Sequence, residues 1–158
     1  MSAAENGVIG DPDWSRGGIG RQSSVMLRPL MTELNWQGLD RMLRSMPALA
    51  RPLTDRLGQK LKDARVVGPT EIPPTVVTMG SRVVSWEMET GAERELTLVY
   101  PWEAGAARGR VSVTSELGAQ LLAAVPGSAL YDRDRVWRIL FLAYQPESGA
   151  DGTLPAPR

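Results

Sequence analysis

Apolar residues recur at three- and four-residue spacing in two stretches of the first half of the chain. The first stretch begins at Asn35, a residue type that favours the N-cap of a helix, and ends at Pro47. The second opens at Arg51-Pro52, where Pro52 suits a first helical turn, and stops at Gly68-Pro69. Because only residues 45–50 separate the two predicted helices, we expect an antiparallel hairpin. The apolar positions are Trp36, Leu39, Met42, Leu43, Met46, Leu53, Leu57, Leu61 and Ala64.

The hydrophobic period drops to two residues after the stiff Ile72-Pro73-Pro74 junction, which predicts β-strands. Ser115 is a favourable cap for a short helix over 116–124. Residues 136–144 are nearly all apolar, which is typical of a central strand covered on both faces. The other predicted strands are Val76–Met79, Val84–Met88, Leu96–Tyr100, Arg110–Thr114 and Ala129–Tyr131.

This order of elements predicts an α+β fold in two lobes. A short N-terminal antiparallel helical hairpin precedes an antiparallel β-sheet domain that carries one small helix. Residues 1–24 are rich in Gly, Ser and Asp and have no regular apolar pattern, so we expect them to be disordered, and we expect the residues after Pro146 to form a loose tail. The predicted divisions are a disordered arm over 1–24, the hairpin over 25–68, the sheet domain over 69–146 and a flexible tail over 147–158.

Composition excludes several kinds of chemistry. The 158 residues include no Cys and no His, so disulfides, zinc sites built on these residues and histidine-based catalysis are ruled out. The net charge is zero, which gives no general attraction for nucleic acid, and we expect no sequence-specific binding to it. No apolar run is long enough to span a bilayer, so we expect a cytoplasmic protein without membrane contact.

Three pairs of acidic residues stand two positions apart, at Glu87/Glu89, Glu93/Glu95 and Asp132/Asp134. One or two carboxylates with a phosphate could hold magnesium. Alternating side chains that face solvent explain the same spacing. We therefore predict no metal site and no other cofactor.

The hairpin is more basic than the whole chain. Residues 35–65 hold seven basic and three acidic side chains, a net charge of +4. A solvated basic face and a nucleic-acid surface both fit this pattern, but no exposed aromatics are interleaved to make a single-strand groove. The basic face comprises Arg41, Arg44, Arg51, Arg56, Lys60 and Lys62.

Four stretches occur in a fixed order across the second half of the chain: PPTVVTMGSRV (73–83), ETGAERELTLVYP (89–101), RVSVTSELGAQLL (110–122) and LAYQPE (142–147). Together they resemble the carboxy-terminal domain of the bacterial Gre-type transcription factors. Within that family the chain is most similar to the Rnk branch, the regulators of nucleoside diphosphate kinase.

The resemblance implies an FKBP-like sheet domain preceded by an antiparallel coiled coil. It also implies a non-enzymatic partner of RNA polymerase that docks as a monomer at the entrance of the secondary channel. Full Gre factors carry acidic residues at a long coiled-coil tip and stimulate transcript cleavage through magnesium. Here the tip, residues 45–52, contains no carboxylate, so we expect docking without cleavage.

The resemblance also implies which residues contact the polymerase. Ser112 and Thr114 alternate with Val111 and Val113, so we expect the two hydroxyl side chains to be exposed. The full contact set is Tyr100, Pro101, Ser112, Thr114, Ser115 and Leu117. For Tyr100 and Leu117, packing in the core is an equal alternative.

Two departures from the family pattern fall in this region. The chain has Ser115-Glu116 where the family usually has Ser-Pro, and Gly127-Ser128 where it commonly has Gly-Asp. Either change could alter affinity for the partner. Two other functions stay open: a peptidyl-prolyl isomerase, suggested only by the FKBP-like fold, and a direct modulator of nucleoside diphosphate kinase.

Overall fold

The computed structural model describes residues 28–47, 51–105 and 108–149, with the backbone alone for 51–53 and 149. The predicted arm over 1–24 and the last nine residues of the predicted tail lie outside these ranges. The elements are β2 (Leu30–Thr32), α4 (Glu33–Ser45), α5 (Arg51–Asp63), β3 (Arg65–Val67), β4 (Arg82–Glu87), β5 (Glu93–Val99), the 3-10 helix η2 (Pro101–Glu103), β6 (Arg110–Ser112), α6 (Glu116–Leu121), β7 (Ala129–Asp132), β8 (Arg135–Tyr144) and α7 (Pro146–Gly149).

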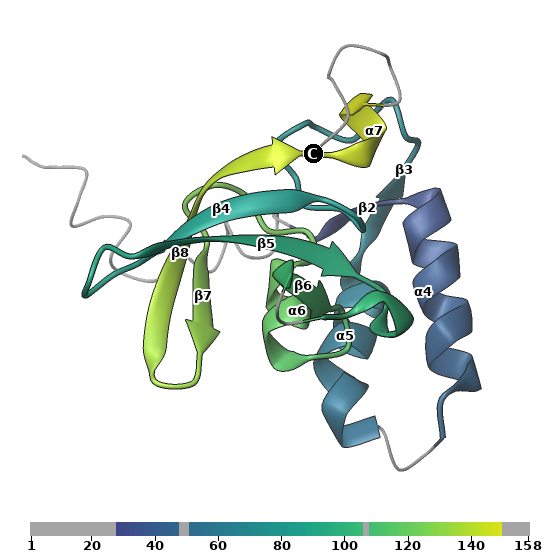
Figure 1. Cartoon of the computed structure of the whole chain (residues 1–158). Helices are drawn as coiled ribbons and strands as arrows, with labels where there is room; N and C mark the ends of the chain where they lie inside the picture. The colour runs from purple at the N-terminus through teal and green to yellow at the C-terminus, as the bar shows by residue number, and fades with distance from the viewer. Residues whose placement is uncertain (1–27, 48–50, 106–107, 150–158) are drawn as a thin grey trace, which may run out of the picture.

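A curled five-stranded sheet forms the second half of the fold, in the order β6-β5-β4-β8-β7 (Figure 1). β4 pairs antiparallel with β5 and β8, and β7 pairs antiparallel with β8. β6 instead runs parallel to β5, with Val99 opposite Ser112, so the prediction of a wholly antiparallel sheet is wrong. The long connection through η2 carries the chain back to a point beside Thr97, so that β6 can run parallel to the last residues of β5.

The buried face of β4 is the one that carries Ser85 and Glu87, and both side chains are almost completely buried. The expectation that Glu87 faces solvent is therefore wrong. Its carboxylate accepts hydrogen bonds from the Thr90 hydroxyl and the Glu89 amide, and it forms an ion pair of 3.0 Å with Arg135. The Thr90 hydrogen bond, with help from the backbone amides and Arg135, holds the pKa of Glu87 below its ordinary value.

β8 is covered on one face and not on both as predicted. Trp137 and Ile139 are buried, whereas Leu140 and Phe141 are 40% and 51% exposed. The pairing with β4 shifts register twice along β8, and such bulges bend a strand and change which side chains point inward. An apolar run alone does not reveal these shifts.

Residues 76–79 do not form the predicted strand, although all four side chains are buried. The backbone of Val77 instead pairs with the residues that follow α6: its amide donates to the Ala124 carbonyl at 2.9 Å and its carbonyl accepts from the Ala123 amide at 2.9 Å. The sequence patterns also missed β2 and β3, which form a separate two-stranded parallel sheet beside the helices.

α4 begins two residues earlier than predicted and is capped by Thr32, whose hydroxyl accepts from the Asn35 amide at 3.2 Å. Asn35 is not the cap. Its buried side-chain oxygen accepts a hydrogen bond of 3.0 Å from the Met79 amide and so ties α4 to the segment before β4. The predicted start of the second helix at Arg51 is confirmed.

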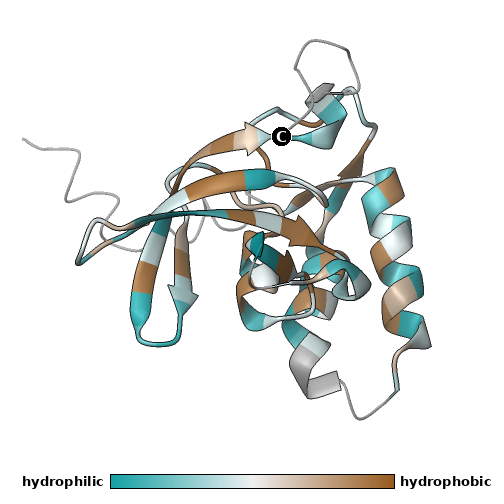
Figure 2. Ribbon diagram, in the orientation of Figure 1, coloured by the Kyte–Doolittle hydropathy of each residue, from teal (hydrophilic) through white to brown (hydrophobic). Residues whose placement is uncertain are grey.

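The helices and the sheet share one hydrophobic core, so the expectation of two lobes is wrong. Leu39 of α4 and Leu57 of α5 are fully buried in the same cluster as Leu98 and Ile139 of the sheet. Apolar residues lie along the helices and strands where these elements come together, while polar residues dominate the outer turns (Figure 2). No helix in the described part of the chain is both long and apolar enough to cross a membrane.

The chain stays ordered past the predicted boundary at residue 146. Residues 146–149 form α7, and the Thr78 hydroxyl donates to Glu147 at 2.6 Å. The sheet and the segment before it therefore hold the first residues of the predicted flexible tail.

Two helical glycines form a matched pair for testing the packing of α6. A Cβ on Gly118 would lie 1.8 Å from the Ser112 carbonyl oxygen, whereas Gly58 of α5 has no described atom within 4 Å of such a Cβ. We expect Gly118→Ala to lower the free energy of unfolding by about 2–3 kcal/mol through overpacking. Gly58→Ala is expected to raise it by up to about 1 kcal/mol through helix propensity. Urea denaturation measures both, and a stable Gly118→Ala variant would contradict the close packing.

Candidate protein-binding surface

The structure brings the six predicted contact residues to one edge of the sheet. Tyr100 and Pro101 follow β5, Ser112 ends β6, and the parallel pairing of Val99 with Ser112 places these segments side by side. Ser115 caps α6 by accepting from the Gly118 amide at 3.0 Å, as predicted. Thr114 and Leu117 lie immediately before the cap and within the first turn of α6.

The hydroxyl groups of this edge bond to one another. The side-chain oxygens of Ser112 and Thr114 lie 2.7 Å apart, and the Ser115 hydroxyl donates to the Ser112 carbonyl at 2.6 Å. All three residues are half-buried, so the expectation that Ser112 and Thr114 are exposed is wrong. β6 ends at Ser112, and the tight turn into α6 interrupts the alternation that the expectation assumed.

Tyr100 and Trp102 form a stacked aromatic pair, with ring centroids 5.0 Å apart and planes inclined by 4°. Tyr100 is half-buried, and burial raises the pKa of its hydroxyl. Trp102 is 72% exposed. The sequence patterns did not single out Trp102. A signal that could have singled out Trp102 is its position after Pro101, outside every alternating or helical pattern.

Tyr100 and Leu117 both pack against the hydrophobic core while keeping part of their surface open. Packing in the core and contact with a partner therefore do not exclude one another for these two residues. A contact role for either stays a prediction.

The predicted basic residues do not form one free cationic face. Arg44 pairs with Asp40 at 2.9 Å, and Arg56 pairs with Glu116 at 2.8 Å. Arg41 and Lys62 are exposed and have no ion pair among the described residues, whereas the side chain of Arg51 lies outside the described part. Some of the predicted basic residues are thus paired with acidic side chains and others are not, which spacing along a helix does not show.

Lys60 binds the end of α6. Its ammonium group donates to the carbonyls of Ala119 and Leu122, both at 2.7 Å, and to that of Gln120 at 3.3 Å. The last carbonyls of a helix lack partners within the helix and favour a cation. Burial, with a smaller contribution from the Arg56 charge, nevertheless lowers the pKa of Lys60 to about 8.

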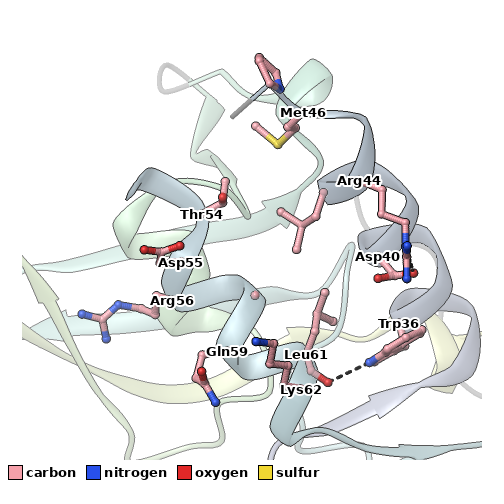
Figure 3. Close-up of a pocket in the computed structure, with 13 residues that line it drawn as sticks. Trp36, Asp40, Arg44, Met46, Thr54, Asp55, Arg56, Gln59, Leu61 and Lys62 are labelled. Carbon is pink, nitrogen blue, oxygen red and sulfur yellow. Dashed lines mark hydrogen bonds and ion pairs between the residues drawn. The ribbon is translucent and has the colours of Figure 1, made fainter. Parts of the chain in front are cut away.

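A cavity of about 730 Å³ separates α4 from α5 (Figure 3). At one end the Trp36 indole donates to the Leu61 carbonyl at 2.9 Å, and charges of both signs, such as Asp40 and Lys62, line the cavity. This mixed lining selects neither an anion nor a cation. Within the described residues, no group of three or more acidic, His or Cys side chains could hold a metal ion.

Comparison with known proteins identifies the family. The family model "Transcription elongation factor, GreA/GreB, C-term" matches residues 62–130. The "Regulator of nucleoside diphosphate kinase" of Escherichia coli K12 is 31% identical over 138 residues, covering 80% of this chain and 98% of that protein. The chain belongs to the GreA/GreB family. Its resemblance to the Rnk branch, drawn from the four sequence stretches, is confirmed.

Other GreA/GreB proteins are similar to this chain. A "Prokaryotic transcription elongation factor GreA/GreB" structure from Nitrosomonas europaea superposes with a TM-score of 0.65 and is 32% identical, covering 74% of this chain and 98% of that one. The "Transcription elongation factor GreA" of Thermodesulfovibrio yellowstonii is 36% identical over 66 residues, which is 42% of each chain. The α+β fold is therefore that of this family.

The lowered pKa of Lys60 predicts a pH dependence of stability. Between pH 8 and the ordinary pKa of 10.5, the unfolded chain holds a proton that the folded chain has released. The free energy of unfolding therefore rises as the pH increases through this window, by an amount on the order of 3 kcal/mol. Lys60→Met lacks the titrating group and serves as the reference in urea denaturation. Parallel pH profiles for the two proteins would contradict the assignment.

Proposed function

We propose that this GreA/GreB-family protein is a transcription regulator that docks on core RNA polymerase at the rim of the secondary channel and does not stimulate transcript cleavage. It acts in the cytoplasm, as a monomer, without a cofactor. The similarity to an Rnk-type protein over 98% of that protein's length carries this proposal.

The contact surface that we propose is the sheet edge described above. The segment after β5, the end of β6 and the start of α6 together contribute Tyr100, Pro101, Ser112, Thr114, Ser115 and Leu117. The stacked ring of Tyr100 and the mutually bonded hydroxyls hold this edge in one geometry, which lowers the entropy lost on docking.

Two features support docking without cleavage. The predicted tip, residues 45–52, which includes the connection between α4 and α5, contains no carboxylate that could bind a hard cation. α4 and α5 have 13 residues each, so each is only about 20 Å long. Leu39 and Leu57 bury both helices in the core of the sheet, which limits their projection further. We also propose that the helices form the short coiled hairpin and the sheet the FKBP-like domain that the resemblance implies.

The isomerase and kinase-modulator alternatives have less support than docking on RNA polymerase. An isomerase needs an open aromatic pocket, but the inner face of the sheet is filled by core residues such as Leu98, Leu121 and Ile139. Direct modulation of nucleoside diphosphate kinase is favoured only by the name of the Escherichia coli relative. Recovery of the kinase and not core polymerase from a lysate, with the tagged full chain as bait, would favour that alternative.

Competition with a full-length Gre factor tests the shared docking site. We expect saturating amounts of the protein to suppress Gre-stimulated transcript cleavage, because both proteins would occupy the same rim. Cleavage assays on stalled elongation complexes measure this effect, with Gly58→Ala as a folded positive control. Unchanged cleavage at saturation would show that the docking site is not shared.

Cleavage by the protein itself tests the argument from the connecting segment. Neither the wild type nor a variant with Ala48→Asp and Ala50→Glu should stimulate cleavage, because short helices keep even an acidic tip away from the catalytic centre. Cleavage by the double variant would mean that the missing carboxylates, and not the length, are limiting. Cleavage by the wild type would refute the assignment to a non-cleaving role.

A further inference from the structure

A pocket of about 400 Å³ opens between α4 and η2, next to the proposed contact edge. The stacked rings of Tyr100 and Trp102 form one side of it, and residues of α4, among them the apolar Met42, form the other. Its lining residues are Gly38, Arg41, Met42, Ser45, Tyr100 and Trp102. Gly38 is needed at this position because a Cβ there would lie 2.6 Å from the Tyr100 hydroxyl oxygen.

Two hydrogen-bond donors of this pocket have no partner among the described residues. Within the described residues, neither the exposed Arg41 guanidinium nor the Trp102 indole N–H makes a hydrogen bond or an ion pair. Arg44, one turn further along α4, is by contrast paired with Asp40. A free cation beside an indole donor is complementary to a carboxylate.

The pocket is held in shape before any partner binds. The Glu103 carboxylate accepts from the Tyr100 amide at 3.2 Å and fixes the turn that carries Trp102. The parallel stack with Tyr100 then holds the indole in place. Rigid aromatic residues and arginine account for most of the binding energy in protein interfaces, so this combination has the chemistry of a docking site.

We propose that this pocket receives an apolar side chain of RNA polymerase that is flanked by a carboxylate, with Trp102 covering the apolar group and Arg41 pairing with the acid. This inference rests on the proposed function and specifies its contact. The pocket shares Tyr100 with the proposed contact edge, so one partner surface can cover both. Charge complementarity with Arg41 selects an acidic partner segment over a basic one.

Binding of the fluorescently labelled full chain to core RNA polymerase tests the proposal. We expect Trp102→Ala and Arg41→Glu each to weaken binding at least about tenfold. Arg41→Lys should retain most of the affinity, and Arg41→Glu should reduce the dependence of binding on salt. The matched controls are Tyr131→Ala, an aromatic residue that is 60% exposed on β7, and Arg65→Glu, an exposed arginine of β3; both should bind within about twofold of the wild type.

The outcomes separate this inference from the proposed function. If the wild type binds and both pocket variants bind equally well, the pocket is not the contact and the inference is overturned. If the wild type does not bind polymerase, the proposed function fails, and the partner assigned to the pocket fails with it. A wild-type dimer that Trp102→Ala dissociates in sedimentation would identify a second copy as the occupant and also overturn the inference. Unchanged thermal unfolding of each variant confirms that the comparison is between folded proteins.

Discussion

The burial of α4 and α5 against the sheet is the constraint on which the rest of the structure depends. Leu39 and Leu57 are completely removed from solvent by this packing, so neither helix can leave the sheet without exposing a large apolar surface. Two polar contacts fix how the helices lie on it: Asn35 holds the segment before β4 at Met79, and Lys60 holds the end of α6. Both contacts satisfy backbone groups that would otherwise be buried without partners.

The sequence patterns predicted those elements whose side chains follow one period from end to end. This group includes α5 and β7. The cap of α6 at Ser115 was also predicted, because the preference for serine at a cap is local. The patterns failed where tertiary contacts override local preference. Glu87 is buried because Thr90 and Arg135 reach it, and Asn35 is drawn inward by an amide 44 positions away. The parallel β6 could not be predicted either, because pairing direction depends on the path of the connecting loop.

The residues of the candidate site were predicted in part. The errors again arose where tertiary contacts, and not local sequence patterns, decide what surrounds a side chain. Resemblance to the family selected Tyr100 and the residues near Ser115, and the fold gathers them at one edge. The basic face was the weaker prediction, because spacing along a helix gives the direction of a side chain and not its partner. Lys60 points at carbonyls 59 to 62 positions away, and Arg56 at Glu116. Trp102 was missed because exposure of an aromatic side chain has no sequence period.

Packing the helices into the core also limits how this protein can act on a partner. A helix pair that projects freely can carry a reactive tip to a distant site. The position of that tip is then set only by the length and stiffness of the two helices. Here α4 forms one wall of the pocket beside Tyr100 and Trp102. Because α4 packs in the core that it shares with the sheet, the sheet sets the orientation of this helix. The same burial that shortens the reach of the helices makes their junction with the sheet rigid. A rigid junction beside Arg41, which has no ion pair among the described residues, suits recognition of a partner surface because a preformed surface loses little entropy on binding.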